Sequence, residues 1–321
     1  MKKLYEVLGI KLLTADVGIE IECEGHGLTP VNSAYWRTEQ DGSLRGEYPH
    51  ECAEFVLKKP IHEKSVKTAI DQLIEAQKDA VLNFSYRTSV HIHVNCLDMN
   101  ATQLLTFAYA YLLFEIPLLN YCGDERKGNR FCLRLRDAEK QLRPLSWMIT
   151  EGFRSIGMID PNEYRYAAMN LAALPKYGSV EFRSMRGNLE KEVLTTWVTA
   201  LLELRAFSLK YNSPKELYED LAKLGANELF KKCFTTTYDS LFYPGMDRDV
   251  LESVSLSIEI PFEWERQQDM EKERKEMDKL AGRVIYEVIG DEIPRALDID
   301  AVLQRARLRN VHIEAVPDPL F

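Results

Sequence analysis

The segment VGIEIECEG (17–25) alternates apolar and acidic residues, and this alternation constrains the fold more than any other feature of the chain. Successive side chains of a strand point to opposite faces, so Glu20, Glu22 and Glu24 share one face and the apolar residues share the other. Like charges at this spacing repel, and burying an unpaired carboxylate is costly. The segment therefore predicts a strand whose acidic face either meets solvent or holds a cation. Mg²⁺ is the natural candidate because it prefers oxygen ligands.

The composition is that of a globular protein with a full core, since 45% of the 321 residues are hydrophobic and 28% are charged. A net charge of -9 has the wrong sign for a protein whose main partner is nucleic acid. We expect no membrane partner, because no signal-peptide core opens the chain and no apolar run approaches the ~20 residues of a membrane span. The six cysteines contain no CxxC pair, which favours reduced thiols and a cytoplasmic location.

The hydrophobic patterning predicts a mixed α+β fold. Strands are expected at 16–24, 51–58, 88–97, near 164–171 and at 179–184. Helical patterns follow Pro60 and Asn100, and a third long helix is expected from about 190 to 210.

A helix restart after the third long helix marks the expected domain boundary. The run SPKE (213–216) combines an N-cap serine, a proline at the first helical position and a capping-box glutamate. We therefore expect a first domain over 1–210 and a mainly helical C-terminal extension over 211–321. Within the extension, a charged helix over about 263–288 is expected to pack on its own domain, because two heptads are too few to indicate a coiled coil.

The later strands repeat the pattern of the first, with an apolar back and a charged or polar front. The residues on these fronts are Glu54 in ECAEFVL, Ser89, His91 and His93 in SVHIHV, and Glu181 and Arg183 in SVEFRS. A single acidic residue or a lone HxH is weak evidence, because such residues are commonly just hydrogen-bonded in a surface or a core. Four strands of this kind together favour a functional cluster on one face of a sheet.

Three further features are open to two interpretations each. Asp41-Gly42 forms the tip of an ordinary hairpin turn or brings a carboxylate to the site. Glu115, in an otherwise apolar helix, is either a surface residue at the helix end or a buried acid that faces the site. The segment 126–143 holds seven Lys or Arg, and it is either a solvated face or a flexible loop that contacts phosphates.

Taken in order, these pieces resemble the amidoligases, which are carboxylate–amine ligases related to glutamine synthetase and glutamate–cysteine ligase. The resemblance covers about residues 16–210. It is carried by GIEIECE (18–24), DGSL (41–44), Glu54, SVHIHV (89–94), YRYAAMN (164–170) and SVEFRSMRG (179–187). It implies a curved antiparallel sheet whose concave face holds the site and whose convex face is covered by helices.

The resemblance also implies roles for the matching residues. The expected metal ligands are Glu20, Glu22, Glu54 and Glu181, and no role is carried onto Glu24. The expected catalytic residues are Arg183, Arg186, His93 and Asp41, with the arginines on the phosphoryl group and either His93 or Asp41 acting on the amine. The expected nucleotide or substrate contacts are His91, Ser43, Arg165 and Asn170.

The implied reaction uses ATP and Mg²⁺. ATP phosphorylates a carboxylate to an acyl phosphate, and an amine then displaces phosphate to form an amide or isopeptide bond. The substrates are expected to be small-molecule or peptide carboxylates and amines, and the oligomeric state stays open. Three alternatives stand beside this reading: a phosphotransferase like the guanidino kinases, a non-catalytic structural or binding protein, and a metal-dependent hydrolase. The hydrolase would use His91 and His93, but several glutamates suit Mg²⁺ better than Zn²⁺.

Overall fold

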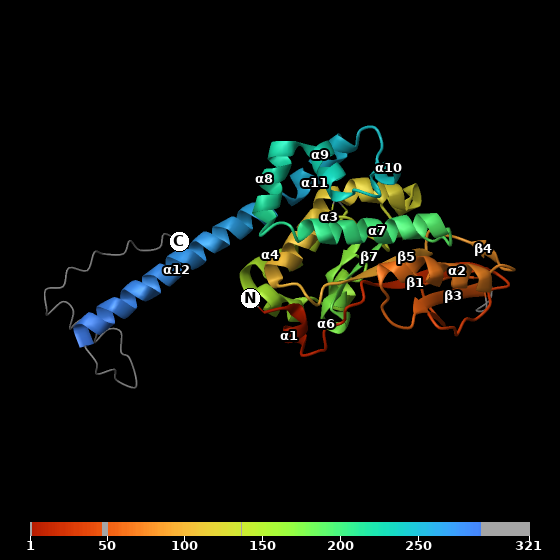
Figure 1. The fold of residues 1–321 in the computed structure, drawn as a ribbon, viewed down its shortest axis with the longest axis horizontal. Helices are drawn as coiled ribbons and strands as arrows, with labels where there is room; N and C mark the ends of the chain where they lie inside the picture. The colour runs from red at the N-terminus through yellow and green to blue at the C-terminus, as the bar shows by residue number, and fades with distance from the viewer. Residues whose placement is uncertain (1, 47–50, 136, 290–321) are drawn as a thin grey trace. The chain divides into compact units, whose positions relative to one another are not determined.

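The computed structural model describes residues 2–46, 51–135 and 137–289. It is an α+β protein built on a seven-stranded open sheet in which every pair of strands is antiparallel (Figure 1). The strands are β1 (Val17–His26), β2 (Trp36–Glu39), β3 (Cys52–Leu57), β4 (Val81–Asn83), β5 (Ser89–Asn95), β6 (Met169–Asn170) and β7 (Ser179–Arg186). Their order is β2-β3-β1-β5-β7-β6, and β4 pairs with the end of β1. The predicted α+β class with an antiparallel sheet is confirmed.

The strands with alternating patterns lie where they were predicted. The stretch near 164–171 differs, because Pro161 begins a short helix and only Met169 and Asn170 pair with β7. Two strands were not predicted: β2 (WRTE) lacks a repeated apolar alternation, and β4 has three residues. Short strands of this kind are fixed by their partners rather than by their own pattern.

The apolar sides of the strands form one face of the sheet, and helices that include α3 (Ala101–Cys122) and α7 (Lys191–Ser208) pack over that face (Figure 1). The helices are α1 (Leu4–Leu8), α2 (Val66–Ala76), α3 (Ala101–Cys122), α4 (Arg143–Glu151), α5 (Pro161–Tyr164), α6 (Leu174–Tyr177), α7 (Lys191–Ser208), α8 (Pro214–Leu224), α9 (Ala226–Cys233), α10 (Tyr238–Leu241), α11 (Met246–Ser257) and α12 (Glu259–Ile289). Phe107 and Tyr111 of α3 pack on Phe182 of β7, with ring centroids 5.8 and 5.0 Å away. Because one face is buried in this way, the charged face of the same strands is left to the site.

Helix α3 is the central helix of the core. Asn100 caps it, with its side chain accepting from the backbone N–H of Gln103, while the Gln103 side chain accepts from the Asn100 N–H. The length of this apolar helix differs from the prediction that no apolar run approaches a membrane span. α3 is the one helix in the described ranges that is long and apolar enough to cross a membrane, and 83% of its apolar window is buried inside the protein. It is therefore a core helix. All six cysteines are free.

The C-terminal helices begin as predicted but belong to the first compact unit. Ser213 caps α8 by accepting from the N–H of Glu216, and α8 and α11 pack against α3. The chain divides into one unit over Met1–Trp264 and a second over Glu265–Phe321. The division thus follows Trp264 and not residue 210, because the helices after 210 share the core of the sheet domain. The described part of the second unit is helical as far as Ile289, and the helix predicted over about 263–288 is thus confirmed.

Candidate functional site

The charged face of the sheet brings together the residues that the alternating patterns singled out. The strand register sets acidic residues and histidines of neighbouring strands directly opposite one another. The opposed pairs are Glu20–His91, Glu22–Glu54 and His93–Glu181. Directly opposed side chains lie close enough to interact, so the four strands form one cluster.

His91 lies at the centre of this cluster and is buried. Its Nδ1 is 3.2 Å from Glu20 Oε2 and 3.5 Å from Glu181 Oε1. Its Nε2 is 2.7 Å from Ser89 Oγ, which in turn donates to Glu22 Oε2 at 2.5 Å. One imidazole therefore connects the carboxylates of β1 with that of β7 and fixes their orientation.

Glu181 is held by two partners besides the histidines. Asn170 Nδ2 donates to its Oε2 at 2.6 Å, and Arg183 pairs with its Oε1. Burial would raise the pKa of Glu181, but the charges of Arg183, His91 and His93 together outweigh burial and lower it. Glu181 is therefore an ionised carboxylate in a buried position.

The other carboxylates of the cluster differ in their electrostatics. Burial would raise the pKa of Glu20, but hydrogen bonds to His91 and His93 lower it. Burial raises the pKa of Glu22, and burial followed by repulsion from Glu20 raises the pKa of Glu54 to about 8. A divalent cation would relieve this repulsion, because it favours the ionised form of each carboxylate.

Two groups within the described ranges have the spacing of metal ligands. The first is Glu20, His93 and Glu181, and the second is Glu22, Asp41 and Glu54, with the ligand atoms of each group within 4.8 Å of one another. The second group offers only carboxylate oxygens, which suits Mg²⁺. All four carboxylates expected to bind metal thus lie in these groups, so the residues present fit the expected ion. Glu24, by contrast, accepts the backbone N–H of Arg45 at 2.8 Å.

A cleft of about 920 Å³ opens beside the Glu22 end of the cluster. Its lining includes five arginines together with two carboxylates, two hydroxyls and two aromatic rings. These residues are Arg45, Arg87, Arg130, Arg165, Arg183, Glu22, Asp41, Ser43, Ser89, Phe131 and Tyr166. Nε of Arg183 is buried and has no hydrogen-bond partner among the described residues. An unpaired buried donor in a cationic cleft points to an anionic ligand, because leaving it unsatisfied costs free energy.

Aromatic rings hold the arginines of the cleft in place. Cζ of Arg87 lies 5.4 Å from the ring centroid of Phe131, and Cζ of Arg130 lies 4.9 Å from the same centroid. Cζ of Arg165 is 4.5 Å from the Tyr166 centroid, and the Phe131 and Tyr166 rings meet edge to face. The planar guanidinium groups are therefore partly ordered before any ligand binds.

A β-bulge aims Arg183 at the cluster. Between the pairs Val90–Met185 and Ile92–Phe182, β7 has one residue more than β5. Phe182 and Met185 are both buried in the core, and Arg183 lies between them on the charged face. A bulge leaves backbone groups without ladder partners and redirects a side chain, which is its role here.

Arg126 supplies hydrogen bonds to the backbone at this bulge. It is fully buried, and its Nη2 and Nε donate to the carbonyls of Arg183 and Ser184 at 2.8 and 3.1 Å. Its Nη1 also donates to the carbonyl of Thr88 at 3.3 Å. No carboxylate is among these partners, so the guanidinium joins the start of β5 to the bulge of β7 through backbone oxygens alone.

A second cavity, of about 480 Å³, lies at the Glu20 end of the cluster. Glu20 and His93 line it, and the His93 ring meets the Tyr177 ring edge to face at 5.5 Å between centroids. Nζ of Lys176 lies 4.5 Å from the Tyr177 centroid. Burial would lower the pKa of His93, but the hydrogen bond to Glu20 and the negative charges of Glu181 and Glu20 together raise it, so the imidazolium form is favoured.

Some of the predicted catalytic and binding residues line the cleft, others belong to the carboxylate cluster, and one lies outside both. Asp41 and Ser43 line the cleft, where Asp41 Oδ1 accepts the Ser43 N–H at 2.6 Å, and Arg165 lines it as well. Asn170 contacts Glu181, as described above. Arg186 lines neither cavity, and its Nη1 donates instead to the Tyr121 carbonyl at 3.2 Å, at the end of α3. The structure therefore gives Arg186 a contact to the core helix and not a place in the cluster.

The contacts of the other two ambiguous features narrow their interpretation. Glu115 is buried, as one interpretation expected, but its carboxylate accepts the Leu135 N–H and does not join the cluster. In the segment 126–143 most described cations have partners: Lys127 pairs with Asp124, Arg134 with Asp137, and Lys140 with Glu163. Arg130 is the residue of this segment whose guanidinium lines the cleft. The described part of the segment is thus not a simple solvated face, and its role as a flexible loop that contacts phosphates stays a prediction.

Sequence reasoning missed several residues of the cleft. Arg45 and Arg87 were not predicted, although Arg87 comes just before the SVHIHV strand and Arg45 follows the DGSL turn. Arginines are too common in the chain for position alone to select these two. A scan of protein-family models finds no match to this chain, and a comparison with curated proteins finds none either.

Proposed function

We propose that the protein is an ATP- and Mg²⁺-dependent carboxylate–amine ligase that forms an amide or isopeptide bond through an acyl phosphate. One observation supports the proposal: a carboxylate cluster lies between two cavities, and one of them is lined by Arg183, whose buried Nε has no partner among the described residues. Phosphoryl transfer needs charge neutralisation and in-line positioning more than it needs a protein nucleophile. Carboxylates for cations and arginines for phosphates meet that need.

The arginine-lined cleft is the proposed nucleotide site. Its volume suits a nucleotide, its arginines suit a triphosphate, and the rings of Phe131 and Tyr166 offer faces on which a base can stack. Glu22, Glu54 and Asp41 would hold Mg²⁺ on the phosphate side, with Glu20 and Glu181 as ligands on the other side. Mg²⁺ bound there would neutralise phosphate charge and orient the terminal phosphoryl group.

The reaction then takes two balanced steps. An oxygen of the substrate carboxylate bonds to the terminal phosphorus, while the bond from that phosphorus to the bridging oxygen of ADP breaks. The amine nitrogen next bonds to the acyl carbon, the bond from that carbon to the phosphate oxygen breaks, and the departing phosphate takes up the proton that the amine loses. Arg183 would stabilise charge on the transferring group, and His91 would keep the carboxylates of β1 and β7 in position.

His93 and Asp41, the two candidates for acting on the amine substrate, lie on opposite sides of the cluster. His93 lines the second cavity, but its raised pKa suits it to hold negative charge rather than to accept a proton. Hydrogen bonds to Ser43 and Glu22 lower the pKa of Asp41 against the effect of burial, so Asp41 is ionised on the cleft side. We therefore propose that Asp41 acts with the metal ligands and His93 with the acyl substrate.

The arrangement of the sheet supports the same proposal. Helices cover one face, and the cluster occupies the other, which is the arrangement that the resemblance to the amidoligases implies. We propose a glutamine-synthetase-like catalytic sheet on this ground. A cytoplasmic location, which accords with six free cysteines, belongs to the same proposal.

Isotope transfer tests the mechanism directly. The protein is incubated with Mg²⁺, ATP, an amine panel and carboxylates labelled with ¹⁸O, and the nucleotide and phosphate products are analysed. We expect ADP and phosphate that carries one labelled oxygen per turnover, formed only when a carboxylate and an amine are both present. AMP as the product, or phosphate labelled from solvent alone, contradicts the ligase. A stable phosphorylated acceptor formed without amine identifies the phosphotransferase alternative instead.

A further inference from the structure

The second cavity lies at the end of the carboxylate cluster away from the arginine-lined cleft. Glu20 and His93 line the cavity, whereas Glu22 and Ser89 line the cleft, and His91 contacts carboxylates on both sides. In phosphoryl transfer the attacking and leaving oxygens lie roughly in line on opposite sides of the phosphorus. A phosphoryl donor in the cleft therefore leaves this cavity to the acceptor carboxylate, an assignment that rests on the proposed function.

The rim of the cavity carries positive charge in a chain whose net charge is -9. Lys58 and Lys59 follow β3, and Lys176 lies in the last turn of helix α6; all three line the cavity. Hydrogen bonding to Tyr177, with smaller contributions from Glu20 and Glu39, raises the pKa of Lys176 and keeps its ammonium group charged. Arg37, which also lines the cavity, pairs with Glu39. The three lysines thus attract an anionic ligand, and opposite charge on a ligand aids both encounter and orientation.

An apolar wall stands beside these lysines. Ile10 and Leu13 line the cavity and are 41% and 45% exposed, with Pro60 near them in the lining. The segment that carries Leu13 is fixed, because Asn95 Nδ2 donates to the carbonyls of Leu13 and Ala15 at 2.9 and 2.8 Å. Large apolar side chains held at the mouth of a charged cavity are typical of a surface that another molecule covers.

The size of the cavity also bears on the ligand. A volume of about 480 Å³ lies in the range of roughly 300–1,000 Å³ found for sites that bury drug-sized ligands. No single free amino acid combines an apolar side chain for Ile10 and Leu13 with further anionic groups for Lys59 and Lys176 once its reacting carboxylate is at Glu20. A peptide supplies all of these groups along one chain.

We propose that the second cavity binds a peptide-borne carboxylate, in a segment that combines acidic and apolar residues. The reacting carboxylate reaches Glu20 and His93, acidic neighbours contact Lys59 and Lys176, and an apolar side chain packs on Leu13. The carboxylate substrate of the ligase is then a polypeptide, and the bond formed is an isopeptide or a peptide-terminal amide.

Peptide binding without nucleotide tests this assignment. The probe is a fluorescein-labelled octapeptide of alternating leucine and glutamate, and binding is followed by fluorescence anisotropy at low salt. We expect saturable binding by the parent protein and at least tenfold weaker binding by the double variant Lys59→Ala/Lys176→Ala. An unlabelled peptide with serine in place of leucine should compete at least fivefold less well, and free glutamate at least a hundredfold less well.

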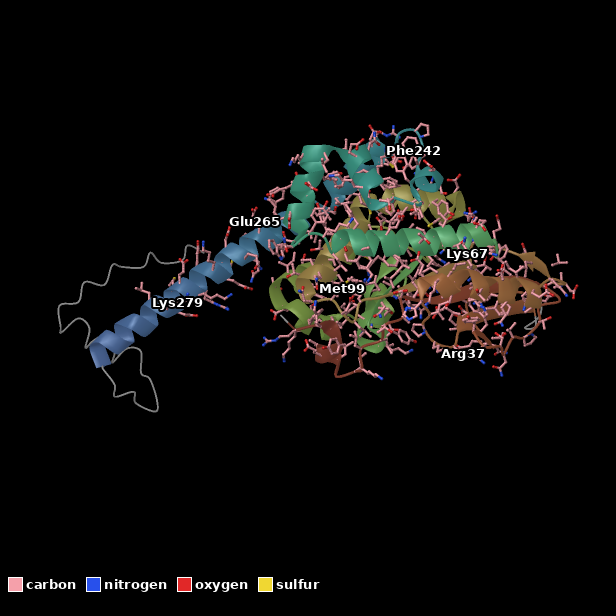
Figure 2. The ribbon with its side chains drawn as sticks, in the orientation of Figure 1. Arg37, Lys67, Met99, Phe242, Glu265 and Lys279 are labelled. Carbon is pink, nitrogen blue, oxygen red and sulfur yellow. The ribbon has the colours of Figure 1, made fainter. Side chains whose placement is uncertain are left out.

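The matched control is Lys67→Ala. Lys67 is an exposed lysine on α2, and in Figure 2 it is labelled near the helices whereas Arg37 is labelled at the opposite margin of the sheet. We expect this variant to bind the probe as the parent does. Because both sets of variants change only exposed or rim lysines, circular dichroism and melting curves should match those of the parent.

Three results would overturn the proposal: an octapeptide of leucine and lysine that binds equally well, a double variant with parental affinity, or free glutamate that competes as well as the peptide. Failure of the proposed function gives a different result. If the acidic peptide binds with the expected dependence on Lys59 and Lys176 but no panel member yields ADP, the cavity assignment holds and the ligase fails. If free amino acids drive ADP formation and peptides do not, the ligase holds and the peptide assignment fails.

Discussion

Replacement of Glu115 by glutamine should make the protein's stability less dependent on pH. Burial raises the pKa of Glu115 from 4.5 to about 8 in the folded protein, against a smaller opposing effect of the Leu135 N–H. The folded state therefore keeps a proton that the unfolded state releases, so the parent loses stability as the pH rises from about 4.5 to about 8. One pKa unit corresponds to about 1.36 kcal/mol, so this carboxyl group alone costs roughly 2 to 3 kcal/mol between pH 5 and pH 7.

Glutamine has no such titration. Its side-chain oxygen can still accept from Leu135, so the free energy of unfolding of Glu115→Gln minus that of the parent should grow by roughly 2 to 3 kcal/mol from pH 5 to pH 7. The measurement is urea denaturation of both proteins at pH 5, 6 and 7. The variant-minus-parent difference in the free energy of unfolding is compared between pH 5 and pH 7. Effects of the substitution that do not depend on pH, and the titration of distant groups, cancel in this comparison.

Glu203→Gln provides a control of opposite sign. Hydrogen bonds from Thr237, Thr236 and Thr235 lower the pKa of Glu203 against the effect of burial. Its carboxylate therefore stabilises the folded state above its unfolded pKa, and this contribution disappears as the pH falls. We expect Glu203→Gln to be less stable than the parent at pH 7 and closer to it in acid. A difference for Glu115→Gln that is the same at pH 5 and pH 7 would refute the account of Glu115.

Three further predictions concern the site. Glu54→Gln, like substitution of each other expected metal ligand, should abolish the thermal stabilisation that Mg²⁺–ATP gives the parent; equal stabilisation in melting curves would remove the metal assignment. Arg183→Lys keeps the charge but loses the planar fork, so turnover should fall about a hundredfold, as expected for the loss of roughly 3 kcal/mol from one donor. Nucleotide affinity, measured by calorimetry, should change little, and near-parental turnover would make Arg183 a structural partner of Glu181. Arg126→Lys should lower turnover in the parent but add nothing in the Arg183→Lys background, whereas additive losses in the double mutant would show that Arg126 does not act through Arg183.

The strands of the sheet could be predicted because each of them alternates. In β1, β3, β5 and β7 one face is buried against helices, and burial of one face imposes the period of two that a sequence displays. The edge strand β2 and the short β4 show no such period. The division after Trp264 could not be predicted from the sequence either. Ser213 correctly marks the start of a helix, but a helix cap does not indicate which hydrophobic core the helix packs into.

The sequence could predict which residues form the candidate site, but not how they are arranged in space. Alternation indicates which side chains share a face of a strand, and that is why Glu20, His91 and Glu181 could be selected together. The register that sets His91 between two carboxylates depends on pairing between distant segments, which no local pattern encodes. Arg186 shows how far a motif can predict a contact. It lies in the same SVEFRSMRG segment as Arg183, but its side chain contacts Tyr121 of the core helix and not the cluster.

The bulge in β7 has a consequence for deletions in this strand. At the bulge, Arg183 and Ser184 of β7 stand opposite one residue of β5. Without Ser184, Phe182 and Met185 would still face the core while Arg183 faced the cluster, now in an unbroken alternation. By pattern alone, loss of Ser184 would therefore look harmless. The carbonyl of Ser184, however, accepts from the fully buried guanidinium of Arg126. Deletion of Ser184 would remove one hydrogen-bond acceptor from a buried guanidinium that water cannot solvate instead. We therefore expect this deletion to destabilise the fold, although it restores a regular alternation in β7.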